Sequence, residues 1–202
     1  MKTKKLSTKQ LTVLGLMIAV LVLMSYTPLG YLNIGPLAIT FNMIPVAIAA
    51  IACGPLGGAV LGLTSFGQCI GIGGVSAMGA TLFSISPVLA FIQRFVPRFL
   101  DGWLLGYLFR WLRKATKNTT LAGYITGFLS AFLNTVFFMV ALVVLFGNTD
   151  YVKNLIGGRN IIVFICAFVG VNAICEMISA TILTGVISVA LKKARLILQE
   201  EK

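Results

Sequence analysis

Residues 39–62 read ITFNMIPVAIAAIACGPLGGAVLG, and this stretch decides the fold. It belongs to two apolar runs, Ile39–Ala52 and Leu56–Ile70, which are separated by Cys53-Gly54-Pro55. Proline cannot continue a helix and glycine permits a tight turn, so Gly54-Pro55 stops the first helix and lets the chain reverse. The sequence therefore predicts a helical hairpin.

The composition around this hairpin is that of a protein embedded in lipid. Of the 202 residues, 58% are hydrophobic and 10% are charged, against roughly 25% charged in an ordinary soluble domain. A water-soluble fold of this size leaves a large part of its area facing solvent and cannot hide so much apolar surface. We therefore expect an integral membrane protein.

Further apolar runs lie on both sides of the hairpin. A helix needs about 20 apolar residues to cross the hydrocarbon layer. The first run is interpreted as a helix and not as a signal peptide, because no small-x-small cleavage signal follows it. We predict a single all-α domain over residues 1–202 with six transmembrane helices: Leu11–Tyr26, Ile39–Ala52, Leu56–Ile70, Pro87–Phe109, Leu121–Phe146 and Ile161–Leu191. The predicted outer loops are residues 31–36, Gly71–Gly79 and Gly147–Asn160.

The net charge of +11 comes mainly from three short basic clusters. They are Lys2, Lys4, Lys5 and Lys9, then Arg110, Arg113, Lys114 and Lys117, and finally Lys192, Lys193, Arg195 and Lys202. Basic residues gather on the cytoplasmic side of membrane proteins, so we expect both termini to be cytoplasmic. A nucleic-acid partner is not expected, because the continuous basic face with interleaved aromatic residues is missing.

The residue types that are absent exclude much of catalysis. Without histidine there is no imidazole base or imidazole metal ligand. No G-x-x-x-x-G-K-[ST] motif is present for ATP, and the four cysteines form no C-x-x-C pair. We expect no catalytic residues, no metal and no cofactor. An intramembrane enzyme, with a serine or threonine near Glu176, and a structural or regulatory membrane subunit without a ligand remain as alternatives.

Three ionisable residues share one stripe of the fourth predicted span. Arg94, Arg98 and Asp101 are spaced by four and three residues, which places them on one helical face. Arg98 and Asp101 are interpreted as an ion pair that orders the helix. This leaves Arg94, whose two-pronged guanidinium is a candidate for binding an anionic group such as a carboxylate.

Polar residues in other spans are further candidates for ligand contact. Asn134 lies in the fifth span, and Asn172 and Glu176 lie four residues apart in the sixth, while Gln68 ends the third. Buried ionisable groups in a membrane indicate function unless they pair structurally. The alternative is hydrogen bonding between helices, which is common in membrane bundles.

Small residues in the first span permit close helix contact. Gly15 and Ala19 form a small-x-x-x-small pair, which either packs internally or contacts another protein.

Several motifs resemble those of one family. They are residues 29–46 (LGYLNIGPLAITFNMIPV), residues 54–59 (GPLGGA), residues 62–65 (GLTS) and residues 96–102 (VPRFLDG). Together these motifs resemble the substrate-binding S-components of energy-coupling factor (ECF) vitamin transporters.

The resemblance implies a non-enzymatic binding subunit in the membrane of a bacterial cell. Its partners would be a small-molecule vitamin, a transmembrane coupling subunit and two cytoplasmic ATPases that hydrolyse ATP. It also implies that Gly15 and Ala19 in the first helix contact the coupling subunit.

The candidate residues favour pantothenate among the vitamins. Arg94 with Asn134, Asn172 and Glu176 suits a small monoanion that carries hydroxyl and amide groups. The aromatic candidates, Tyr31 and Phe41, are few, and a flat flavin or pterin ring gains from stacking. Riboflavin, folate and cobalamin remain alternatives.

Overall fold

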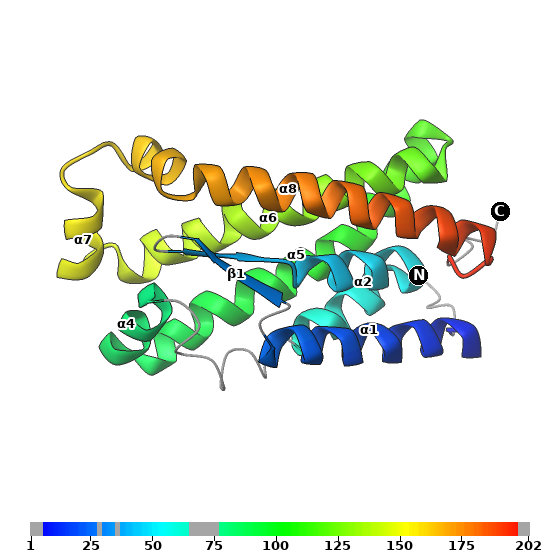
Figure 1. The fold of residues 1–202 in the computed structure, drawn as a ribbon, viewed down its shortest axis with the longest axis horizontal. Coiled ribbons are helices and arrows are strands. Elements are labelled where there is room, and N and C mark those ends of the chain that lie inside the picture. The colour runs from blue at the N-terminus through cyan, green and yellow to red at the C-terminus, as the bar shows by residue number, and fades with distance from the viewer. Residues whose placement is uncertain (1–5, 28–29, 35–36, 65–76, 198–202) are drawn as a thin grey trace.

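A computed structural model describes residues 6–27, 30–34, 37–64 and 77–197 of the protein. Long helices run side by side along the longest axis of the molecule (Figure 1). In chain order the elements are α1 Thr8–Tyr26, β1 Tyr31–Ile34, β2 Leu37–Thr40, α2 Met43–Thr64, α4 Ala77–Ile85, α5 Pro87–Thr116, α6 Thr119–Phe146, α7 Asp150–Ile156 and α8 Ile161–Lys193. The first turn of α1 and the last turn of α8 lie at the same end of the molecule (Figure 1).

Local capping explains where the long helices begin. Ser7 and Gln10 form a capping box at the start of α1, with the Ser7 N–H donating to Gln10 Oε1 at 2.9 Å. Ser86 caps α5 and is followed by a proline in the first turn, where the missing N–H has no cost. Asn118 and Asn160 cap α6 and α8 through their side-chain oxygens. The starts of these four helices lie within three residues of the predicted ones.

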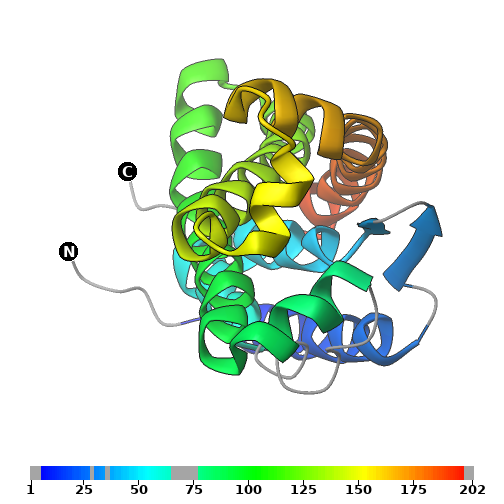
Figure 2. The same ribbon diagram turned by 90° about the vertical axis from the view of Figure 1, so that its left-hand side faces the viewer.

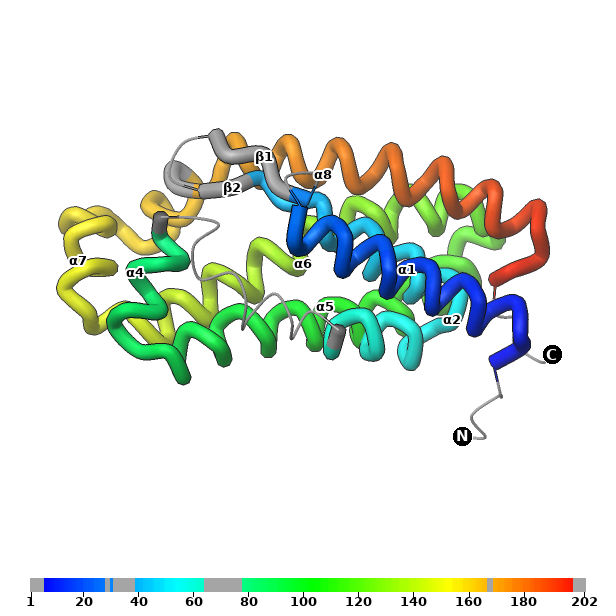
Figure 3. The backbone as a smooth tube through the Cα atoms, turned by 60° about the horizontal axis from the view of Figure 1, so that its bottom comes forward, coloured from blue at the N-terminus to red at the C-terminus, as the bar shows by residue number. Residues whose placement is uncertain are grey.

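The chain reverses inside α2, as the sequence predicts. Gly54 has φ 71° and ψ −159°, which interrupts the helix. A Cβ on Gly57 would lie 2.5 Å from the carbonyl oxygen of Ala49, a distance that requires the two arms of α2 to fold back on each other (Figure 3). Each arm has about ten residues and is about 15 Å long, roughly half the hydrocarbon thickness.

The two predicted hairpin spans are therefore longer than the described helical arms. Residues 39 and 40 belong to β2, because this part of the chain pairs with β1 in antiparallel register. Residues 65–70 lie outside the described part of the chain. The hairpin itself is confirmed, whereas two full-length helices at Ile39–Ala52 and Leu56–Ile70 are not shown.

Glycines let the second arm of α2 approach α5 at backbone distance. A Cβ on Gly58 or on Gly102 would overlap the carbonyl group of the other residue. Farther along, a Cβ on Gly62 would lie 2.7 Å from the Cα of Phe99, and one on Gly106 would overlap the backbone of Pro55. Small residues allow such contacts between membrane helices. This interface fixes the position of the charged stripe of α5 relative to α2.

Helices α6 and α8 pack antiparallel through a second set of small residues. A Cβ on Gly127 would lie 2.9 Å from the Cβ of Thr184, and a Cβ on Gly123 would overlap Ser188. The Ser188 hydroxyl donates to the carbonyl of Gly185 at 2.7 Å, within its own helix. Buried hydroxyls at this interface therefore pack without a polar partner on the opposite helix.

Among the described residues, four helical segments have the length and apolarity of a membrane span, but the second of them reverses at Gly54, so neither of its arms crosses the hydrocarbon layer by itself. They are Thr8–Tyr26, Met43–Leu63, Thr119–Phe146 and Val169–Lys193. Helix α5 has 30 residues, about 45 Å, but Arg94, Arg98 and Asp101 lower the apolarity of its first half. The structure thus agrees with a helical integral membrane protein, and six crossings stay a prediction.

Three elements, β1, α4 and α7, begin in segments that the sequence predicts as loops. The β1–β2 hairpin occupies most of residues 31–40 and lies at the edge of the bundle beside α8 (Figure 2). Helix α7 lies inside the predicted loop Gly147–Asn160, and α4 begins at Ala77, within the predicted loop Gly71–Gly79. A separate hydrophobic cluster explains both short helices, because Leu82 of α4 and Val152 of α7 are buried with Phe146 and Phe164 at that end of the bundle.

Candidate functional site

A small polar cavity lies where β2 leads into α2 and where α5 and α6 pack against this junction. Its volume is about 10 Å³, which is room for about one water molecule. The residues around it come from four elements and the turn between two of them: Thr40, Asn42, Met43, Val46, Arg98, Asp101 and Asn134. Five of these seven side chains are polar or charged, which is unusual at membrane depth.

Glu176 of α8 closes one side of this region. Its Oε1 accepts a hydrogen bond from the backbone N–H of Thr40 at 2.7 Å, and the side chain is only 5% exposed. Arg98 of α5 is close enough to Glu176 for an attractive charge interaction. Glu176 therefore connects α8 to β2 by a hydrogen bond and to α5 by charge.

Asn42 and Asp101 contribute buried polar atoms that lack partners. Asn42 is 4% exposed and Asp101 is 2% exposed. Within the described chain, no group hydrogen-bonds to Asn42 Nδ2, Asn42 Oδ1 or Asp101 Oδ1. Native buried polar atoms nearly always have partners, so each exception needs an explanation. The ion-pair interpretation expects Arg98 to donate hydrogen bonds to the Asp101 carboxyl group, but Asp101 Oδ1 accepts none.

Sequence reasoning did not select Asn42, Asp101, Arg98 or Thr40 for the site. The signal for Asp101 was its position on the charged stripe of α5, which was assigned to helix ordering. Asn42 had the weaker signal of an amide residue at the start of an apolar run. Thr40 takes part through its backbone N–H, which no side-chain pattern reveals.

The structure brings two of the predicted residues to this cavity. Asn134 of α6 lines it, and Glu176 contacts Thr40 at its edge. Asn172 lies one turn before Glu176 on α8 and is half-buried. Arg94 lies one turn before Arg98 on α5, with its guanidinium carbon 5.2 Å from the ring centroid of Phe83 in α4.

The other predicted residues lie apart from the cavity or outside the described chain. Phe41 is half-buried and packs against the hydrophobic core that α1, α2, α5, α6 and α8 share. The backbone of Tyr31 belongs to β1, but its side chain is outside the described residues, and so is all of Gln68. The aromatic and amide contacts predicted for Tyr31 and Gln68 therefore stay predictions.

Gly15 and Ala19 lie on an exposed face of α1. A Cβ on Gly15 would have no described atom within 4 Å, and Ala19 is exposed. Large apolar side chains surround the pair on this helix, with Leu16 57% and Leu23 61% exposed. No described residue packs on Gly15, so this face is open to lipid or to another protein.

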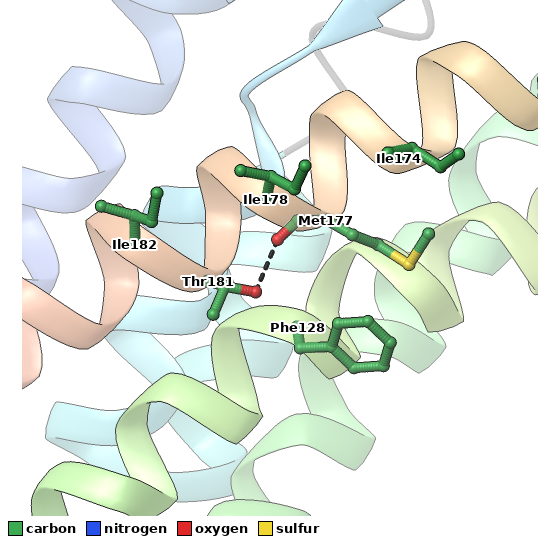
Figure 4. Close-up of a pocket in the computed structure, with 6 residues that line it drawn as sticks. All are labelled: Phe128, Ile174, Met177, Ile178, Thr181 and Ile182. Carbon is green, nitrogen blue, oxygen red and sulfur yellow. Dashed lines mark hydrogen bonds between the residues drawn. The ribbon is translucent and has the colours of Figure 1, made fainter.

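A second hollow is an apolar groove on the surface of α6 and α8 (Figure 4). It has a volume of about 400 Å³ and is lined by Phe128, Ile174, Met177, Ile178, Thr181 and Ile182. Its one hydroxyl, on Thr181, donates to the carbonyl of Met177 in the same helix. The groove therefore offers no polar group to a ligand and suits contact with hydrocarbon.

Comparison with known protein families agrees with this picture of a polar site inside an apolar helical bundle. Residues 9–188 match the family described as ECF transporter, substrate-specific component. Among curated proteins, no individual sequence matches the chain. Because the match covers most of its length, the chain belongs to the substrate-specific components of ECF transporters, which are membrane subunits that give these importers their specificity and are not enzymes.

Proposed function

We propose that this chain binds pantothenate for an ECF importer of the bacterial cell membrane. It delivers the vitamin together with a transmembrane coupling subunit and two cytoplasmic ATPases. Family membership supports a substrate-specific role. The choice of vitamin rests on the chemistry of the polar cavity and of the charged stripe beside it.

The observation that carries the proposal is the set of polar side chains at membrane depth. Asn42, Asp101 and Asn134 line one cavity, and Glu176 contacts its edge. Such groups are costly in a bilayer and are retained at binding sites. They offer amide and carboxyl partners for the hydroxyl and amide groups of pantothenate.

The positions of the arginines and the lack of aromatic side chains in the described lining of the cavity also favour pantothenate. Arg98 lines the cavity and is attracted to Glu176. We assign the ligand carboxylate to Arg94, one turn earlier on α5, because a guanidinium presents two parallel donors to a carboxylate. The described lining residues include no aromatic side chain, so they provide no stacking surface for a flavin or pterin ring.

Ligand entry requires the cavity to expand. Its 10 Å³ volume is far below the several hundred cubic ångströms of typical small-molecule sites. The hydrogen bond between Thr40 and Glu176 holds β2 against α8 at this point. We propose that this bond stays in place when the vitamin binds and that the other walls of the cavity move apart.

The proposed topology has six crossings and cytoplasmic termini. The crossings are α1, the two arms of α2 with the residues next to them, α5, α6 and α8. Lys9 of α1, Arg113 of α5 and Lys193 of α8 belong to helix ends that lie at one end of the bundle (Figure 1), and the positive-inside rule assigns this end to the cytoplasm. The exposed Gly15 and Ala19 face is assigned to the coupling subunit.

Calorimetric titration of the purified, detergent-solubilised chain tests this function. Pantothenate, riboflavin, folate and cobalamin are titrated in parallel, and circular dichroism checks that the protein is helical. Saturable binding of pantothenate alone is the expected result. Binding of another vitamin instead would overturn the pantothenate assignment, and binding of none by folded protein would favour a subunit without a ligand.

A further inference from the structure

Two side chains that line the cavity between β2, α5 and α6 carry three unpartnered polar atoms. They are Asn42 Nδ2, Asn42 Oδ1 and Asp101 Oδ1. Both side chains are more than nine-tenths buried. Their apolar neighbours in the lining, Met43 and Val46, offer no hydrogen bond. Leaving such atoms unpaired is unfavourable, so the arrangement is that of a site whose partner comes from outside the chain.

We propose that Asn42 and Asp101 form a subsite that takes the amide or hydroxyl part of the ligand and excludes its carboxylate. This inference rests on the proposed function. The Asn42 amide has one donating and one accepting end, and a ligand amide or hydroxyl group complements both. A carboxylate only accepts, so it would pair with Asn42 Nδ2 alone and place its charge against two oxygens.

The neighbouring charges then orient the ligand. Arg98 lines the same cavity, and Glu176, to which it is attracted, brings a negative charge to this region. Arg94, on the same face of α5, lies one turn closer to α4, where it contacts Phe83. The ligand therefore binds with its hydrogen-bonding chain at Asn42 and Asp101 and its carboxylate toward Arg94.

Binding of two ligands to the full-length protein tests this orientation. Pantothenate is compared with pantothenol, in which an alcohol replaces the carboxylate and the hydroxyl and amide groups are unchanged. The variants are Asn42→Leu, which removes both amide atoms at similar size, and Asp101→Asn, which keeps one oxygen and replaces the other by an NH2 donor that cannot ionise. Thr184→Val is the matched control, because Thr184 Oγ1 is also buried without a partner but lies outside the cavity.

The expected result is a loss of affinity that is the same for both ligands. Asn42→Leu weakens pantothenate and pantothenol by about tenfold or more, the usual effect of losing hydrogen bonds in a buried site. Asp101→Asn weakens both by a smaller common factor, and Thr184→Val changes neither. Thermal unfolding in detergent checks that each variant is folded. Asn42→Leu and Thr184→Val are expected to fold, because an apolar side chain in place of an unpaired buried polar group does not leave a hydrogen bond unmade.

Other outcomes overturn the subsite. Unchanged affinity in both variants shows that the two side chains do not contact the ligand. Tighter binding of pantothenate alone by Asp101→Asn places the carboxylate at Asp101 and reverses the orientation. Wild-type protein that binds no vitamin overturns the proposed function together with the subsite, whereas wild-type binding with unaffected variants overturns the subsite only.

Discussion

Glu176 on α8 accepts a hydrogen bond at 2.7 Å from the backbone N–H of Thr40, which lies 136 residues earlier in the chain. The bond joins the last residue of the β-hairpin to a helix at the opposite end of the sequence. Because Arg98 also attracts Glu176, one carboxyl group connects three elements around the cavity. A change at Glu176 therefore affects both the position of β2 and the charge balance of the site.

Substitutions at Glu176 separate these two roles. Glu176→Gln keeps an oxygen that accepts from Thr40 and removes the charge, whereas Glu176→Ala removes both. We expect Glu176→Ala to weaken pantothenate binding by about tenfold or more, and Glu176→Gln to stay within a few-fold of wild type, because the tether positions β2. Calorimetry on both variants makes the comparison. Equal losses would show that the charge, and not the tether, controls binding.

Arg94→Ala is expected to weaken binding of pantothenate but not of pantothenol. The guanidinium is assigned to the ligand carboxylate, and losing a charge-assisted hydrogen bond costs about 1.5–3 kcal/mol, or roughly tenfold to a hundredfold in affinity. Arg113→Ala is a matched control, because Arg113 also lies over an aromatic ring, that of Phe109 at 6.0 Å, but at the far end of α5. Equal losses for both ligands, or a loss in the control, would contradict the assignment.

The glycine contact between α2 and α5 should be sensitive to a single methyl group. Gly58→Ala places a Cβ against the carbonyl of Gly102, and overpacking of this kind costs about 1–3 kcal/mol. Gly15→Ala is the control, since its Cβ meets nothing within 4 Å. We expect a melting temperature several degrees lower for the first variant and no loss for the second, measured in the same detergent. Similar melting temperatures would mean that the helices separate to admit the methyl group.

The main helices could be predicted from the sequence because each depends on local signals. Gly54-Pro55 stops a helix wherever it occurs, and apolar length alone indicates α1, α6 and α8. The four-residue strands and the seven-residue α7 have no comparable pattern. They exist through tertiary contacts, such as the burial of Val152 of α7 beside Phe146.

The candidate site was only partly predictable for the same reason. Asn134 and Glu176 were selected because polar groups are rare at membrane depth. The spacing of Arg94 and Arg98 does not decide which of them is assigned to a ligand carboxylate, since both share one face of α5. The choice depends on how α2 and α6, which pack against both α5 and α8, place Arg98 within electrostatic reach of Glu176. Asn42 became a candidate only when its unpaired amide atoms were seen at the cavity.

Bulky residues on the exposed face of α1 should separate binding from transport. Gly15→Leu and Ala19→Leu add volume where no described residue packs on Gly15, so we expect normal pantothenate affinity in detergent. Uptake by cells that contain the whole transporter should fall, because the added side chains prevent close approach of the coupling subunit. Val144→Leu on α6 is the control, since Val144 is 74% exposed and apolar but belongs to another helix. Normal uptake in the α1 variants would move the coupling interface to a different face, and lost affinity would show that α1 shapes the vitamin site.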